Sequence, residues 1–298
     1  MEARQFEQLT REIMQFFEDS DVDEVLVNGV ASACAVQGDT LKAISAPFES
    51  IKDLTLWSQH WARRLGVRLD PLVGAAGGSF DGQNYRWHCV MPPLAPDGPL
   101  FSIRRHRFDQ LDLSRFEVDS DTLSKLEESM IKRANILICG PTGSGKTSVL
   151  STLLRTYAGS ERVILVESLP ELPLPTPFSA RLIERQANLE QVGAFGLDRL
   201  LREALRLRPD RLVVGEVRGA EAAVLCEALL SGHQGVMATI HAATSSEAVS
   251  KLGMLAGLTL RASSASRWCS IPIGVLKMQR GCPPRLASLS QEVIVPSA

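Results

Sequence analysis

Three absences narrow the classes of protein to which this 298-residue chain could belong. It has no run of about 18 apolar residues, so we expect no transmembrane helix. Its first residues lack the basic-then-apolar pattern of a signal peptide. Its six cysteines are scattered and form no C-x-x-C pair, which argues for reduced thiols and against a structural zinc. We therefore expect a cytoplasmic protein in which any link to a membrane comes through partners.

Excess charge of one sign is also lacking. The formal net charge is −2, so no overall field draws the chain toward nucleic acid or an anionic membrane. Apolar residues make up 45% and charged residues 22%, as in ordinary globular proteins. The length is enough for about two domains, and we find no internal repeat. We expect no nucleic-acid partner.

The most specific motif present is G-x-x-x-x-G-K-T at residues 140–147, directly after an apolar run and before a helix-compatible stretch. Glycines let backbone N–H groups surround a phosphate, and the following helix N-terminus adds partial positive charge. Lys146 would reach the β- and γ-phosphates, and the Thr147 hydroxyl would bind Mg²⁺. A chance match is the alternative, but the strand before and the helix after favour a P-loop. The expected nucleotide-binding residues are Gly140, Pro141, Thr142, Gly143, Ser144, Gly145, Lys146, Thr147 and Ser148.

Apolar periodicity predicts two domains of class α/β. Residues 1–107 form an α+β domain with two amphipathic helices and short strands, in which residues 71–82 are a glycine-containing loop. Residues 108–120 are a polar linker. Residues 121–298 alternate strands with helices, which predicts a mainly parallel sheet, followed by a weakly structured tail from residue 281.

Polar residues follow the later strands of the second domain. Glu167 and Glu171 follow the first, Glu216 the next, and His241 the last. Functional groups collect at the carboxyl ends of parallel strands, where a carboxylate can orient water directly or through Mg²⁺. We therefore predict a site there with Glu216 as its central acid and, with Thr147, a metal ligand.

Each of these residues has a plainer interpretation. Glu216 could be a surface acid paired with Arg218, and His241 a satisfied core or surface histidine. Glu167 and Glu171 could be ordinary loop acids, and His233, in a turn, could have only a loop role.

Arginines are dense in two places. Those of the helix at residues 197–207, Arg199 and Arg202 among them, are expected to lie on a solvated face and pair with glutamates. Arg104 and Arg105 end the last strand of the first domain. They gain functional interest only if that domain meets a nucleotide bound to the second.

These motifs, in this order, resemble the secretion and pilus-assembly ATPases of the type II and type IV secretion superfamily, above all the tight-adherence (Tad) pilus and type IV secretion branch. The similarity covers about residues 21–257. It comprises an opening strand and turn at 22–29, a pre-motor segment at 91–105, a Walker A motif at 140–147, an Asp box at 166–172, a Walker B block at 205–219 and a His box at 232–242.

The resemblance implies a cytoplasmic hexamer with a PAS-like first domain on a RecA-like P-loop motor, using ATP and Mg²⁺. It makes Glu216 the Walker B glutamate, Glu167 and Glu171 the Asp-box acids, and His241 the His-box histidine. The resemblance also assigns Arg86, with Arg104 or Arg105, as arginines that close over nucleotide held between the domains.

One departure from the family pattern is Ser168, which replaces the second acid of the usual Asp-box pair and puts metal geometry or turnover in question. We expect a motor ATPase for pilus assembly or protein export, with an inner-membrane platform or channel protein as its partner. The alternatives are a RecA-like nucleic-acid translocase and a non-hydrolysing, nucleotide-gated scaffold.

Overall fold

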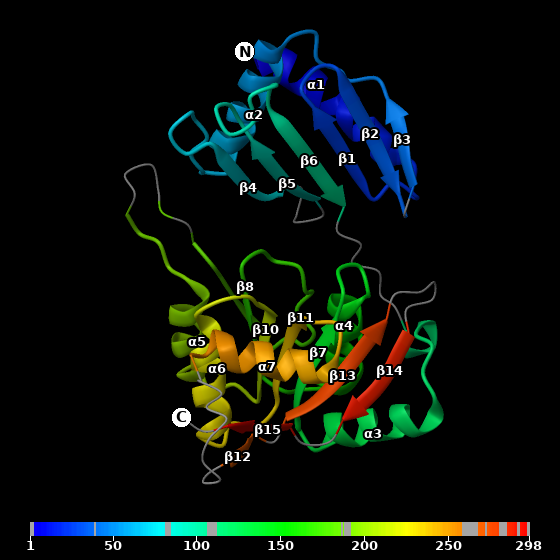
Figure 1. Ribbon diagram of the computed structural model, residues 1–298, viewed down its shortest axis with the longest axis vertical. Coiled ribbons are helices and arrows are strands. Elements are labelled where there is room, and N and C mark those ends of the chain that lie inside the picture. The colour runs from blue at the N-terminus through cyan, green and yellow to red at the C-terminus, as the bar shows by residue number, and fades with distance from the viewer. Residues whose placement is uncertain are drawn as a thin grey trace. The chain divides into compact units, whose positions relative to one another are not determined.

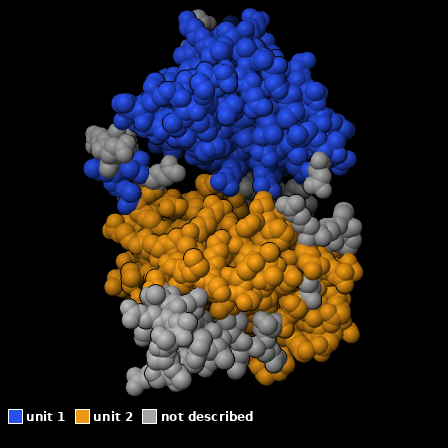
Figure 2. All heavy atoms as spheres, viewed as in Figure 1, with its two compact units in different colours: residues 1–107, 186–194 blue, residues 108–185, 195–298 orange. Residues whose placement is uncertain are grey.

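The chain folds into two compact units, shown as a ribbon in Figure 1 and as spheres in Figure 2. The computed structural model describes residues 3–38, 40–80, 85–105, 112–185, 187, 192–257, 268–271, 273–279, 285–290 and 293–296. Unit 1 consists of residues 1–107 and 186–194, and unit 2 of residues 108–185 and 195–298. Within the described residues, every helix is too short or too polar to cross a bilayer.

Unit 1 is an antiparallel sheet with helices packed on one face. Its elements are α1 Ala3–Met14, η1 Gln15–Glu18, β1 Glu24–Asn28, β2 Ser32–Gln37, β3 Thr40–Ile44, α2 Ile51–Arg64, β4 Ala75–Phe80, β5 Tyr85–Val90 and β6 Leu100–Arg105. The strand order is β3-β2-β1-β6-β5-β4. Apolar side chains of α1 and α2, such as Phe6 and Trp57, share a core with Trp87 of β5 and Ile103 of β6.

The alternation of strand side chains decides where the arginines of unit 1 point. Trp87 and Ile103 are directly paired and fully buried in the core. The next pair along the same two strands is Arg86 and Arg104. Because successive side chains of a strand face opposite sides, this pair lies on the face away from the core.

The prediction of a loop at residues 71–82 is wrong, because Ala75–Phe80 forms β4, an edge strand paired with β5. Glycine permits this strand. A Cβ at Gly77 would lie 2.9 Å from the Trp87 carbonyl oxygen, and one at Gly78 would lie 2.9 Å from Leu65 Cδ1. The glycines that indicated a turn are therefore required by close packing.

Unit 2 contains a mainly parallel sheet, as the alternation of strands and helices predicted. Its described elements are η2 Leu113–Arg115, α3 Ser120–Ile131, β7 Asn135–Gly140, α4 Lys146–Tyr157, β8 Val163–Glu167, β9 Ala180–Ile183, α5 Leu197–Leu205, β10 Arg211–Val217, α6 Glu221–Leu230, β11 Val236–His241, α7 Ser245–Leu255, β12 Trp268–Ile271, β13 Ile273–Gln279, β14 Arg285–Ser290 and β15 Val293–Pro296. The strand order is β14-β13-β7-β11-β10-β8-β9. Only the β13–β14 pairing in this order is antiparallel.

Two apolar cores cover the two faces of this sheet. Leu137 and Cys139 of β7 join the core formed with α5, α6 and α7. Ile136 and Ile138 join the core formed with α3 and α4. All six residues of β7 are therefore buried, which explains why its sequence reads as an unbroken apolar run.

The C-terminal region is more ordered than the sequence predicted. Strands β14 and β15 both lie in the tail predicted to be weakly structured from residue 281, although residues 281–284 lie outside the described residues. β14 adds to the edge of the main sheet by pairing with β13. This tail prediction is wrong because it used local turn signals, whereas strand pairing with distant residues decides the outcome.

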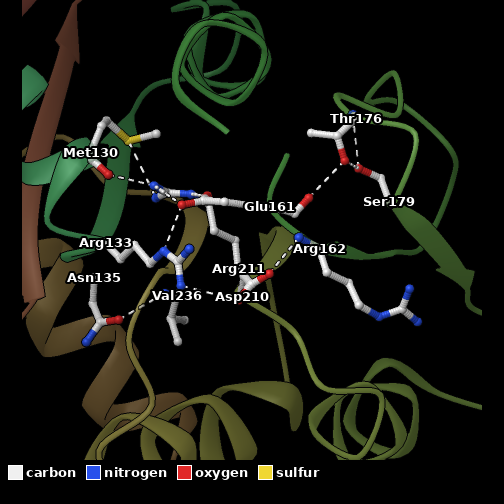
Figure 3. Close-up of polar contacts among 10 residues, drawn as sticks. All are labelled: Met130, Arg133, Asn135, Glu161, Arg162, Thr176, Ser179, Asp210, Arg211 and Val236. Carbon is white, nitrogen blue, oxygen red and sulfur yellow. Dashed lines mark hydrogen bonds and ion pairs between the residues drawn. The ribbon is translucent and has the colours of Figure 1, made fainter. Parts of the chain in front are cut away.

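A polar network ties together the amino ends of the parallel strands (Figure 3). Arg211 at the start of β10 is 1% exposed, forms an ion pair with Glu161 and donates to the Met130 carbonyl at 2.6 Å. Arg133 donates to Glu161 at 2.7 Å and to Asp210 at 3.2 Å. The network thus joins the turns that precede β7, β8 and β10.

We expect Arg211→Met to lower the free energy of unfolding by about 3 kcal/mol or more, because removing one partner leaves the other charge buried and less well paired. Arg202→Met is the matched control, since Arg202 pairs with Glu227 in an exposed contact on the same unit. It should cost less than about 1 kcal/mol. Urea denaturation of the full chain measures both, and equal losses would contradict the role given to the network.

Candidate nucleotide-binding site

The loop between β7 and α4 has the backbone of a phosphate cradle. Gly145 has a φ of 84° and caps the N-terminus of α4, a conformation that glycine adopts without strain. A Cβ at Gly140 would lie 2.6 Å from Ser144 Oγ and 2.9 Å from the Met278 carbonyl oxygen. The Ser144 hydroxyl is buried, and no group of the described residues forms a hydrogen bond with it. An unpaired buried donor beside a helix N-terminus fits an anionic ligand.

Lys146 begins α4 and folds back over the loop. Its ammonium donates to the carbonyl oxygens of Gly140 at 3.0 Å and Pro141 at 2.8 Å. Burial lowers the pKa of Lys146, while the charge of Glu216 acts in the opposite direction. The charge of Glu216 therefore acts on the ammonium of Lys146.

Glu216 lies near the end of β10, where the strand pairing is irregular. The register between β10 and β11 shifts between Val214 and Val217, and Thr239 Oγ1 donates to the Gly215 carbonyl at 2.5 Å. A bulge of this kind redirects a side chain. The Glu216 carboxylate forms an ion pair with Arg218. The ion pair with Arg218, which was the plainer interpretation of Glu216, is thus present.

The structure separates the two acids that the sequence could not distinguish. Glu167 is 2% exposed, and its Oε1 accepts from the backbone N–H groups of Glu171 and Leu172, both at 2.9 Å. Its Oε2 lies 3.1 Å from Arg181 Nε, although this N–H does not point at the oxygen. Burial raises the pKa of Glu167 despite these partners. Glu167 therefore shapes the loop after β8, whereas Glu171 is half-buried on that loop.

His241 at the end of β11 lies beside the P-loop strand. It pairs in register with Gly140, and its Nδ1 is 3.4 Å from Thr142 Oγ1. Its side chain is exposed, so it is not a core histidine. His233 instead has its Nδ1 3.1 Å from the Ala228 carbonyl at the end of α6, which fits the loop role.

The three arginines proposed as phosphate ligands belong to unit 1, while the P-loop belongs to unit 2. Arg105 is bound within its own unit: it donates to the Ser20 carbonyl at 3.1 Å and to the Phe17 carbonyl, and lies 5.3 Å from the Phe17 ring centroid. Arg104 is exposed and stands opposite Arg86. Of the two adjacent arginines, Arg104 is the better placed to reach a ligand.

The arginines of α5 have surface roles. Arg202 pairs with Glu227 at 3.1 Å in an exposed contact, which confirms its predicted pairing with a glutamate on a solvated face. Arg199 instead stacks on Phe195, with its guanidinium carbon 4.2 Å from the ring centroid.

Several residues near the site were missed by the sequence analysis. Arg181 lies beside Glu167, and Lys251 of α7 donates to the His241 carbonyl at 2.9 Å. Glu221 is 5% exposed and accepts from the backbone N–H groups of Arg218 and Gly219. An acid in the first turn of a predicted helix was a usable signal for Glu221. Lys251 gave no local signal, because it comes from a separate helix.

Comparison with known proteins gives concordant matches. The family model described as "Type II/IV secretion system protein" matches residues 86–269. A putative conjugal transfer protein of Mycobacterium tuberculosis is 35% identical over 250 residues, covering 79% of this chain and 70% of the relative. VirB11 of Agrobacterium tumefaciens is 27% identical over 291 residues, covering 86% and 82%.

Among solved structures, the pilus retraction motor PilT with bound ADP superposes with a TM-score of 0.58 at 16% identity. The match covers 96% of this chain and 82% of that one. At this identity the likeness establishes a shared fold.

We expect Glu167→Ala to lower the melting temperature more than Glu171→Ala does. Removing the Glu167 carboxylate leaves the backbone N–H groups of Glu171 and Leu172 without their acceptor, at a cost of about 1–3 kcal/mol. Differential scanning calorimetry of the full chain measures the two variants side by side. If Glu171→Ala proves the more destabilising, the structural role assigned to Glu167 is wrong.

Proposed function

The chain belongs to the Type II/IV secretion system protein family, and from this premise we propose that it is a motor ATPase that couples ATP hydrolysis to domain motion in pilus assembly or protein export. The observation that carries the proposal is that Lys146, just after β7, and Glu216, near the end of β10, lie at the same edge of the parallel sheet. A phosphate-binding lysine and a carboxylate that can orient water are the two groups that phosphoryl transfer to water needs.

Nucleotide binding in this proposal uses the loop at residues 140–147. Backbone N–H groups at the start of α4 and the Ser144 hydroxyl would contact phosphate, and Lys146 would exchange its two carbonyl acceptors for phosphate oxygens. Thr147 and Glu216 offer the hard oxygen ligands that suit Mg²⁺, which when bound neutralises charge on the transferred phosphoryl group.

The acids have different roles in the proposed reaction. Glu216 orients the attacking water. Glu167 acts through the backbone of Glu171 and so holds the loop on which that second acid lies. His241 contacts Thr142 of the P-loop and thereby links the end of β11 to the phosphate-binding backbone.

We further propose that this motor works as a cytoplasmic homohexamer of the Tad or type IV secretion type, bound to an inner-membrane platform or channel protein. In this proposal a PAS-like domain at residues 1–107 is joined by a linker at residues 108–120 to a RecA-like domain at residues 121–298. Exposed Arg104, with Arg86 beside it, would act as the arginine finger that closes on the γ-phosphate.

We expect Lys146→Ala to abolish ATP binding, because it removes the central positive charge of the cradle. Glu216→Gln should keep ATP bound yet reduce phosphate release to background, because the amide cannot accept a proton from water. Equilibrium ATP binding and a phosphate-release assay on the oligomeric protein measure both effects. Undiminished hydrolysis by Glu216→Gln refutes the assignment, and no release by the unaltered protein would favour a non-hydrolysing scaffold.

The arginine assignment has its own test. Arg104→Ala should reduce hydrolysis by about 10³-fold with little change in melting temperature, since its side chain is exposed. Arg105→Ala should chiefly lower the melting temperature, because Arg105 binds two carbonyls and the Phe17 ring within unit 1. Normal hydrolysis by both variants rules out the arginine-finger role.

A further inference from the structure

Two cationic side chains of the described residues, Arg218 and Lys146, interact with Glu216 in different ways. The Glu216 carboxylate contacts the guanidinium of Arg218. Lys146 senses the charge of Glu216, yet the hydrogen bonds of its ammonium go to the carbonyls of Gly140 and Pro141. The direct partner of the acid is thus an arginine that lies outside the P-loop.

The backbone around Arg218 is fixed so that this pairing is favoured. Glu221, buried in the first turn of α6, accepts hydrogen bonds from the N–H groups of Arg218 and Gly219. The turn that follows β10 is therefore held at two consecutive peptide groups. Residues two apart in an extended segment point to the same side, so the Arg218 side chain lies over Glu216.

We propose that Arg218 is a positioning residue that keeps the Glu216 carboxylate from pairing with Lys146 and so leaves the lysine available to the phosphates of an incoming nucleotide. The inference deepens the proposed function and rests on it. Lys146 already feels the charge of Glu216. Without Arg218 the carboxylate would be free to pair with this ammonium, and opposite charges at a site of reduced dielectric attract strongly. Such a pair would compete with phosphate for the same ammonium.

The Arg218–Glu216 pair is also suited to opening during turnover. The Arg218 side chain is 57% exposed, so water can replace the carboxylate as its partner at small cost. The Arg211–Glu161 pair could not separate in this way, since the Arg211 side chain is 1% exposed and would lose the carboxylate without gaining water.

Equilibrium binding of ATP with Mg²⁺ to the full chain tests this inference. Arg218→Ala should weaken ATP binding by about tenfold, a loss equivalent to about 1.4 kcal/mol. The double variant Arg218→Ala/Glu216→Gln should bind ATP within about twofold of Glu216→Gln alone, because the amide does not sequester Lys146. A purely structural role for Arg218 predicts no such rescue, so the double-mutant cycle separates the two.

Two further variants complete the design. Arg218→Lys keeps a cation beside Glu216 and should bind ATP within about twofold of the unaltered protein. If Arg218→Ala does not fold, Arg218→Gln takes its place in the double-mutant cycle. Arg202→Ala removes an arginine from another exposed ion pair of the same unit and should leave ATP binding unchanged.

The inference is overturned if Arg218→Ala binds ATP as tightly as the unaltered protein, or if its weak binding persists in the double variant. The proposed function fails in a different way. In that case the unaltered protein does not bind ATP, or Lys146→Ala binds it equally well. The two failures are therefore distinguishable in a single set of titrations.

Discussion

The candidate site depends on one constraint, the fixed position of β7 in the interior of the sheet. This strand is paired in parallel with β11 on one side and β13 on the other, and apolar cores cover both of its faces. A strand held on four sides cannot shift its register without exposing its core residues. The loop that follows therefore begins at one point in space, and Lys146 and the N-terminus of α4 are placed by the core rather than by contacts of their own.

Charged residues of unit 2 gather at both ends of the parallel strands with opposite consequences. At the amino ends, Arg211 is buried, donates to the Met130 carbonyl and pairs with Glu161, so this pairing fixes the strands. At the carboxyl ends, Glu216 and Arg218 remain partly exposed, and their pairing can change when a ligand arrives. Burial thus separates ion pairs that maintain the fold from ion pairs that can take part in function.

The acids near the P-loop show that chemical type alone does not assign a role. Glu167 and Glu221 are buried carboxylates whose oxygens accept backbone N–H groups, so each holds a turn in place. Glu216 lies at a bulge, and its carboxylate pairs with the exposed Arg218. A carboxylate whose oxygens are already used by backbone is poorly suited to orient water, whereas one held by a single exposed arginine can be released to do so.

The sequence by itself determined the elements whose signals are local. It identified the P-loop, because glycine spacing and Lys146 define that turn without help from distant residues, and it identified the parallel sheet, because β7, β8, β10 and β11 are apolar runs separated by helices. It also placed Glu216 and His241 at strand ends.

Tertiary structure alone decided that β4 is a strand, since only packing against Trp87 and Leu65 explains its glycines. It likewise decided that the Glu167 carboxylate accepts a backbone N–H group and that Arg105 donates to a carbonyl group within unit 1. It also brought Glu221 and Lys251 near the site. Each of these depends on which groups surround a side chain, and those groups come from parts of the chain that no local pattern connects.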